Sequence, residues 1–294
     1  MKKFLLRSAG FVAFFIVFFA VLNTIFLLVI TSASWSFKNR LESLQFEDPD
    51  YELLVLGAST TGDGLDTKFL AEHGIKSYNM AIGGSSPLTS FIQLEEYLAM
   101  YSHKPKYVIM GVNSTMEWDF DREGIHPIIE VTMEGHKFGI EDIPVSKFRW
   151  LGFEVFKRLI NKEHRTAKLV EGQLKIKKQV KDRTRFIDQD LDIELFESSH
   201  WLGELARLCD ENDMELFIVE MPGYRETQNL SEFGPFPIRY ENGASALVCN
   251  FNSREIVEGI DPDLDWVGNS HLNLYGAEKF TSILVDSLQV YLDK

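Results

Sequence analysis

The sequence predicts an α/β protein of three layers, in which helices cover both faces of a mostly parallel sheet. Short apolar runs of strand length alternate along the chain with amphipathic runs of helix length. This alternation is typical of βαβ units, which place parallel strands side by side. The chain has 294 residues, of which about 250 follow an apolar N-terminal stretch, and this length suits one large domain.

The expected elements can be assigned in order from these runs. The predicted strands cover residues 53–56, 76–82, 106–113, 215–222 and 245–251. The predicted helices cover residues 65–74, 90–102, 194–213 and 276–292. Each helix shows apolar residues at helical spacing, and the first is followed by Gly74, a residue that commonly ends helices.

Residues 114–193 interrupt the alternation and are predicted to be a helical insertion. Its second half, residues 164–185, is basic although the whole protein is acidic. A solvated helical face explains this charge most simply. The alternative is a lid or docking arm for an anionic polymer, for lipid headgroups or for a partner protein.

The N-terminus predicts an anchor in the cell membrane. Residues 8–30 carry no charge, and they follow Lys2, Lys3 and Arg7. About 20 apolar residues span a bilayer as a helix, and the basic flank favours an N-terminus that stays inside. We therefore expect a single-pass anchor at 1–31, a stem at 32–50 and an extracytoplasmic α/β domain at 51–294.

A cleaved signal peptide is the alternative to this anchor. Residues 31–33, Thr-Ser-Ala, resemble a small-residue cleavage site, but signal cores usually contain only about 7–15 apolar residues. Both alternatives deliver the domain to the outer side of the cytoplasmic membrane.

Charge and metal-ligand residues exclude several classes of function. The formal net charge is −14, which argues against nucleic acid because phosphate binding needs a basic face. Cys209 and Cys249 fit no metal motif; they either form a disulfide or, as we favour, are buried free thiols. The histidines also lack ligand spacing, so we expect no metal and no cofactor.

The segment VLGASTTG, residues 55–62, reads as a strand that ends in a tight turn at Ser59. A dinucleotide loop would need glycines spaced as G-x-G-x-x-G, and Gly57, Gly62 and Gly64 miss that spacing. A Walker loop would need a lysine, which the turn lacks. Ser59 is therefore either the N-cap of a following helix or a nucleophile.

Three further groups follow the ends of other predicted elements and favour the nucleophile. Gly84 lies after the second strand, Asn113 ends the third, and His271 lies in a loop before the last helix. In an open α/β sheet, groups at the carboxyl ends of the strands gather at one edge. A serine, a base and hydrogen-bond donors at such an edge are the parts that acyl transfer requires.

This order of Ser, Gly, Asn and His resembles the SGNH/GDSL hydrolase superfamily. The resemblance covers the sheet-forming parts of residues 52–113 and 214–292 and implies an SGNH/flavodoxin-like fold. It implies Ser59 as nucleophile and His271 as general base. It also implies an oxyanion hole built from the N–H of Ser59, the N–H of Gly84 and the amide of Asn113.

The sequence departs from the family pattern at two positions. Ala58 replaces the acid that often precedes the nucleophile, and Gly268 stands where the family carries the acid that orients the histidine. The nearest acid is Asp265, six residues before His271, and we predict that it completes the triad. Otherwise a backbone carbonyl orients His271 and the site is a slower Ser–His dyad, or the site is degenerate.

The segment HLNLYGAEKFT is similar to the last block of membrane-anchored family members. These include D-alanyl transfer proteins of teichoic-acid operons and alginate-type polysaccharide O-acetyltransferases. The resemblance implies an esterase or O-acyltransferase that acts on an acylated glycan or cell-envelope polymer, with a multi-span membrane acyltransferase as a partner. The alternative is a non-catalytic accessory protein that binds glycan or scaffolds such a complex.

Overall fold

The computed structural model describes residues 2–32, 50–113, 169–170, 173–174, 190–224, 232–268 and 270–292. The chain divides into two compact units, and the described part of the first is the helix α1, Lys2–Ser32. Within α1, residues Lys2–Phe26 have a mean hydropathy of 2.4 and none of their side chains is buried. No other helix in the described ranges is long and apolar enough to cross a membrane, and a signal sequence would have the same character.

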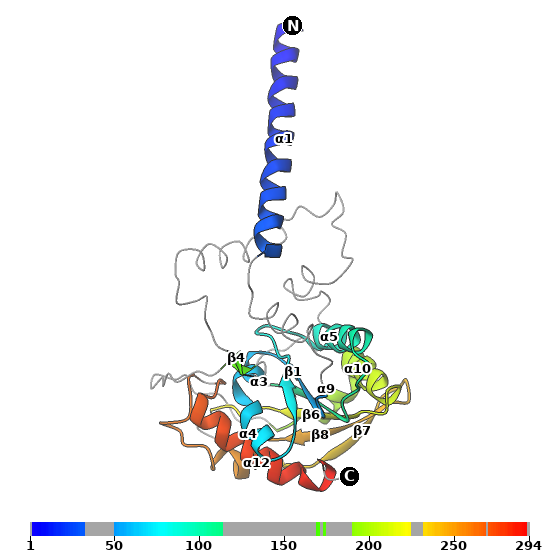
Figure 1. Cartoon of the computed structure of the whole chain (residues 1–294), viewed down its shortest axis with the longest axis vertical. Coiled ribbons are helices and arrows are strands. Elements are labelled where there is room, and N and C mark those ends of the chain that lie inside the picture. The colour runs from blue at the N-terminus through cyan, green and yellow to red at the C-terminus, as the bar shows by residue number, and fades with distance from the viewer. Residues whose placement is uncertain are drawn as a thin grey trace. The chain divides into compact units, whose positions relative to one another are not determined.

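The second unit is built on a six-stranded sheet with the order β2-β1-β3-β6-β8-β7. Figure 1 labels the strands β1, β6, β8 and β7 of this sheet. Every neighbouring pair is parallel except β7 and β8, which are antiparallel. The bounds are β1 Leu53–Gly57, β2 Ser77–Asn79, β3 Tyr107–Val112, β6 Glu215–Glu220, β7 Phe236–Arg239 and β8 Ser245–Asn250. The mostly parallel α/β sheet predicted from the sequence is confirmed.

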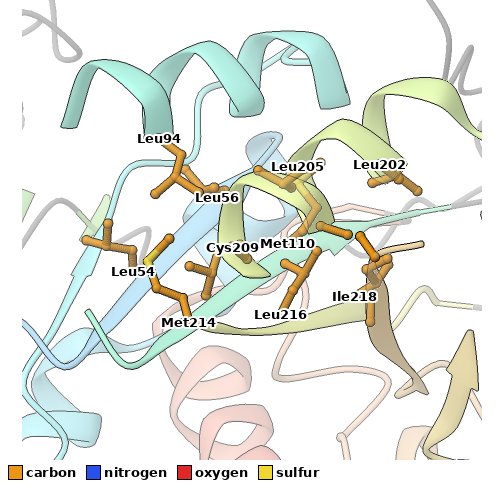
Figure 2. Close-up of a cluster of buried hydrophobic side chains, with 14 of the residues drawn as sticks. Leu54, Leu56, Leu94, Met110, Leu202, Leu205, Cys209, Met214, Leu216 and Ile218 are labelled. Atoms are coloured by element: carbon orange, nitrogen blue, oxygen red, sulfur yellow. The ribbon is translucent and has the colours of Figure 1, made fainter. Parts of the chain in front are cut away.

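Each face of the sheet carries a hydrophobic core, because alternate strand residues point to opposite faces. Leu54 and Leu56 of β1 pack toward α5, Pro87–Met100, and α10, His200–Asp210, in the cluster that Figure 2 shows. Leu53 and Val55 pack on the other face in a cluster with α4, Thr67–Glu72, and α12, Leu274–Leu292. The domain therefore has the three predicted layers.

The two cysteines lie in different cores. Cys209 of α10 belongs to one cluster and Cys249 of β8 to the other, and both thiols are free. Burial raises the pKa of Cys249 to about 12 and raises the pKa of Cys209 further. The free-thiol interpretation therefore fits the structure, and the disulfide does not.

The long helix predicted over residues 194–213 is wrong in one respect, because it is two helices. The helix α9, Ile193–Ser198, ends at Ser199, whose hydroxyl accepts a hydrogen bond from the N–H of Leu202 and thereby caps α10. A serine hydroxyl competes with the helical hydrogen-bond pattern and favours a cap over a helix interior.

Outside the insertion, three short elements were not expected from the sequence. They are the helix α3, Ser59–Gly64, the helix α11, Arg254–Val257, and the edge strand β7. The strand β7 contains Pro237, which cannot donate to a sheet ladder and is tolerated on an edge strand. Such short or proline-bearing segments give no clear periodic signal.

Most of the predicted insertion, 114–193, and of the stem, 32–50, lies outside the described residues. Within the basic segment, the backbone of β4, Leu169–Val170, pairs in antiparallel fashion with β5, Gln173–Leu174. These four residues thus form a short ladder and not the helical face that was expected. The strand β5 contacts α3 of the α/β unit.

Candidate active site

Ser59 is the first residue of α3, directly after β1 and a tight turn. Gly57 has φ +132°, a conformation that residues with a side chain rarely adopt. Ala58 occupies the N-cap position and provides no side-chain hydrogen bond to the helix. Ser59 is therefore not the N-cap, and its hydroxyl is not used to cap α3.

Thr61, the third residue of α3, shows why the strand ends must carry glycine. A Cβ atom at Gly57 or at Gly111 would overlap the side chain of Thr61. The two glycines are register partners in the parallel pair β1–β3. Their lack of side chains lets α3 begin directly over the end of the sheet and fixes the backbone on which Ser59 stands.

The loop after β2 lies against the same turn. The N–H of Ile82 donates to the carbonyl of Gly57 at 2.9 Å, and a Cβ built on Gly83 would lie 3.5 Å from the Cβ of Ser59. Gly84 has φ +80° within a turn closed by the N–H of Ser85 and the carbonyl of Ile82. The loop that carries Gly84 is therefore next to Ser59.

Asn79 connects this loop to α3 through hydrogen bonds. Its side-chain amide is fully buried and donates to the carbonyl of Thr61 at 3.2 Å, while its oxygen accepts the N–H of Ala81. These two hydrogen bonds hold the loop after β2 against α3.

Asn113 follows β3 and is 1% exposed. It stands two residues beyond Gly111, as Ser59 stands two residues beyond the paired Gly57. The chain leaves β1 toward β2 and later returns to β3 on the other side, so the ends of β1 and β3 form a topological switch point. Ligand sites of open α/β sheets lie at such points.

His271 is carried by a narrow loop that approaches from the far end of the chain. Trp266 and Leu272 form an isolated antiparallel bridge, and the N–H of Val267 donates to the carbonyl of His271 at 2.8 Å. Asn273 follows, and its side-chain oxygen accepts the N–H groups of Tyr275 and Gly276 at the start of α12. The loop is thus closed at its base and fixed to a helix.

The imidazole and the serine hydroxyl meet. His271 Nε2 lies 2.7 Å from Ser59 Oγ although the residues are 212 positions apart, and His271 Nδ1 lies 3.2 Å from Ser270 Oγ. Burial lowers the pKa of His271 below its ordinary value of 6.5. The ring is therefore neutral at pH 7, which is the form that can accept a proton.

Asp265, predicted to orient His271, has other partners. Its Oδ2 accepts the N–H of Asp261 at 2.7 Å and the ammonium group of Lys279 at 2.7 Å. The side chain is 1% exposed, whereas Lys279 is about half exposed. No hydrogen bond joins Asp265 to the His271 imidazole in the described structure, so Asp265 holds the 261–265 turn to α12 instead.

Several residues of this network gave only weak signals in the sequence. Asn273 precedes a helix in the manner of an N-cap and could have been found by that rule. Ser270 and Lys279 gave no signal, because their roles depend on how the loop folds back onto α12. Five residues of the insertion could also line the rim of the site according to the sequence, and all of them lie outside the described residues: Trp118, Asp119, Asp121, His126 and His136.

Within the part of the chain that the structure describes, no three His, Cys, Asp or Glu side chains form a group that could hold a metal ion. The chemistry that the arrangement supports is proton transfer and nucleophilic attack by a hydroxyl. The roles of Gly84 and Asn113 as oxyanion donors stay predictions, since they depend on a bound acyl group.

Comparison with known proteins adds two distant likenesses. No protein-family model and no curated protein matches the chain. A crystal structure of a proposed acylhydrolase from Bacteroides fragilis NCTC 9343 aligns with a TM-score of 0.39 and 10% identity, over 89% of this chain and 100% of that chain.

The second likeness is a structure described as a proposed platelet activating factor from Streptococcus pneumoniae. Its TM-score is 0.35 and its identity 11%, over 87% of this chain and 91% of that chain. Likenesses this distant support no inference about activity. The function therefore has to be argued from the residues of this chain.

Proposed function

We propose that this protein is a serine esterase or O-acyltransferase that works through an acyl-serine intermediate. The observation that carries the proposal is the 2.7 Å contact between His271 Nε2 and Ser59 Oγ. A serine within hydrogen-bond distance of a neutral imidazole is the usual arrangement of an activated nucleophile. Its position at the switch point of the sheet adds support, because ligands bind there.

In the proposed reaction, Ser59 Oγ attacks the acyl carbonyl while His271 Nε2 accepts the hydroxyl proton. The negative charge that develops on the carbonyl oxygen is met by the N–H of Ser59, the N–H of Gly84 and the amide of Asn113. His271 then gives the proton to the leaving alcohol, and acyl-Ser59 remains. Water or an acceptor hydroxyl attacks this ester next, with His271 again as base.

The oxyanion donors make a prediction about rate. Removal of one such donor typically costs about 3–4 kcal/mol of transition-state stabilisation. We expect Asn113→Ala to lower kcat by at least about 100-fold with little change in KM, because the oxyanion forms only in the transition state. Steady-state kinetics with a p-nitrophenyl ester measure both constants. A raised KM with an unchanged kcat would contradict the assignment.

The proposed location is the outer side of the cytoplasmic membrane, with α1 as an uncleaved anchor. The basic residues Lys2, Lys3 and Arg7, at the N-terminal end of α1, support this orientation. The proposed substrate is an acylated envelope glycan or teichoic-acid-type polymer, and a multi-span membrane acyltransferase is the proposed acyl supplier. These two identities rest on the resemblance of the segment around His271 to membrane-anchored SGNH members.

Fluorophosphonate labelling of the full-length chain in detergent micelles tests the nucleophile. We expect labelling of the wild type and none of Ser59→Ala. Ser245→Ala, an exposed serine at the start of β8, is the matched control and should label as the wild type does. Equal labelling of Ser59→Ala would place the reactive group elsewhere and contradict the proposal.

A second experiment divides hydrolysis from transfer. The protein is incubated with an acyl donor and glycan oligomers, and the products are weighed by mass spectrometry. Acylated oligomers are expected for a transferase. Free acid as the sole product would support the esterase and contradict the transferase.

A non-catalytic accessory role is the second candidate. The observation that favours it is the absence of a hydrogen bond between Asp265 and the His271 imidazole in the described structure. The Asp265 carboxylate pairs with Lys279 and supports the fold without contacting His271. In that case the protein would bind glycan or scaffold an acyltransferase complex. Absence of labelling at Ser59, together with binding of glycan oligomers, would favour this candidate.

A further inference from the structure

The tautomer of His271 decides whether the proposed dyad can work. An imidazole nitrogen accepts a proton only through a free lone pair, so Nε2 can act as base only when the neutral ring carries its proton on Nδ1. Something must therefore hold the Nδ1–H form and keep Nε2 directed at Ser59. In serine enzymes with a complete triad a carboxylate does this.

Ser270 occupies the position in which that carboxylate would be expected. Its Oγ lies 3.2 Å from His271 Nδ1, and the residue is 5% exposed. His271 is the hydrogen-bond partner that the described structure gives to this hydroxyl. Ser270 is buried, and His271 is partly buried.

Two further observations indicate that the fold holds Ser270 and His271 in this arrangement. The loop that carries both residues is closed by the Val267–His271 hydrogen bond and the Trp266–Leu272 bridge, so the two side chains share one rigid support. Asp265, the acid predicted to orient His271, is held by Lys279 and by the N–H of Asp261.

We propose that Ser270 is the positioning residue of the Ser59–His271 dyad. Its hydroxyl oxygen accepts the hydrogen bond from Nδ1–H, which fixes the ring and leaves Nε2 as the base. This inference rests on the proposed function. When Ser59 attacks, its proton moves to Nε2, while the Nδ1 proton stays in place and no proton passes to Ser270.

A hydroxyl differs from a carboxylate in two ways that the experiment can detect. It carries no charge, so it stabilises the imidazolium through one hydrogen bond and without a coulombic attraction. It can also donate, which would allow the opposite tautomer. The tautomer of His271 is therefore the quantity to measure.

The test compares Ser270→Thr with Ser270→Val, which have nearly the same shape and differ in the hydroxyl. The full-length chain is labelled with ¹⁵N-histidine in detergent micelles, and His271 is assigned by its loss in His271→Asn. We expect Nδ1–H as the main neutral form in the wild type and in Ser270→Thr. In Ser270→Val we expect a shift toward Nε2–H and a further lowered pKa of His271.

Activity supplies the second measurement. Outer partners that orient a metal-bound histidine typically contribute about 10–100-fold, and we expect an effect of the same order for the partner of this imidazole. We expect kcat for a p-nitrophenyl ester to fall by about that factor in Ser270→Val with KM nearly unchanged, and to recover in Ser270→Thr. If both bulkier variants fail to fold, Ser270→Ala is compared with the wild type by the same two measurements.

The outcomes separate this inference from the proposed function. Identical tautomer, pKa and kcat in the variants with and without the hydroxyl would overturn the role of Ser270, whether or not Ser59 is reactive. Absence of fluorophosphonate labelling in the wild type would overturn the proposed function and would leave the Ser270–His271 contact untouched. The nuclear magnetic resonance comparison needs no activity and still reports on the Ser270–His271 contact.

Discussion

At the scale of single residues, the pKa of His271 determines the pH range in which Ser59 can react. Burial lowers this pKa below 6.5, so the neutral base is the main form at that pH and its fraction increases further above it. We expect the rate of Ser59 phosphonylation to level off between pH 6.5 and 8. It should fall as the pH drops through the lowered pKa, because the imidazolium cannot accept the proton.

Fluorophosphonate labelling that is quenched at fixed times measures this profile across pH 4.5–8, in a buffer series of constant ionic strength. A midpoint well above 6.5 would contradict the burial of His271 as the cause. It would instead indicate a nearby carboxylate that stabilises the charged ring.

The residues of the site were predictable to different degrees. Ser59 and His271 could be found because each follows a recognisable element end, and strand ends converge in a parallel sheet. The partner of His271 could not be found in this way. Sequence distance suggested Asp265, but the hairpin turns its carboxylate toward α12, and the adjacent Ser270 lies at Nδ1 instead.

At the scale of elements, Gly276 sets how closely α12 approaches the turn before His271. A Cβ at Gly276 would overlap the carbonyl oxygen of Asp265, while one at Gly268 would meet nothing within 4 Å. Ala normally stabilises a helix by up to about 1 kcal/mol relative to Gly. A loss of stability in Gly276→Ala would therefore be caused by the overlap with Asp265.

We therefore expect Gly276→Ala to lower the free energy of unfolding by about 1–3 kcal/mol, the usual cost of overpacking. It should also slow the labelling of Ser59, because the loop that carries His271 is displaced. Gly268→Ala is the matched control. Chemical denaturation measures the first effect, and equal stability of the two variants would show that α12 does not constrain the loop.

The longer elements followed from periodicity, and the shorter ones did not. The strands β1, β3 and β6 are continuous apolar runs that a parallel sheet buries on both faces. The helix α3 has the sequence STTGDG and no apolar periodicity. It forms because Thr61 fits against Gly57 and Gly111, a tertiary contact that a sequence window does not contain.

At the scale of the whole molecule, the apolar α1 and the basic residues at its N-terminal end predict on which side of the membrane the α/β domain lies. The two native cysteines are buried, so an introduced surface cysteine reports with little background. We expect Ser245→Cys to react with a membrane-impermeant maleimide in intact cells. Lys3→Cys should react only after the cells are opened.

The opposite pattern would place the domain inside the cell and contradict the proposed envelope substrate. Intact mass of the purified chain supplies the complementary measurement. A mass that includes residues 1–31 is expected for an anchor, whereas their absence would establish the signal-peptide alternative.

The central claim is that Ser59 becomes acylated with His271 as its base. A short pulse of p-nitrophenyl acetate, an acid quench and peptide mass spectrometry test it most directly. We predict an acetyl group on the peptide that contains Ser59 in the wild type, and none in Ser59→Ala or His271→Asn. Acetylation that persists at Ser59 without His271, or that appears only on other residues, would contradict the account.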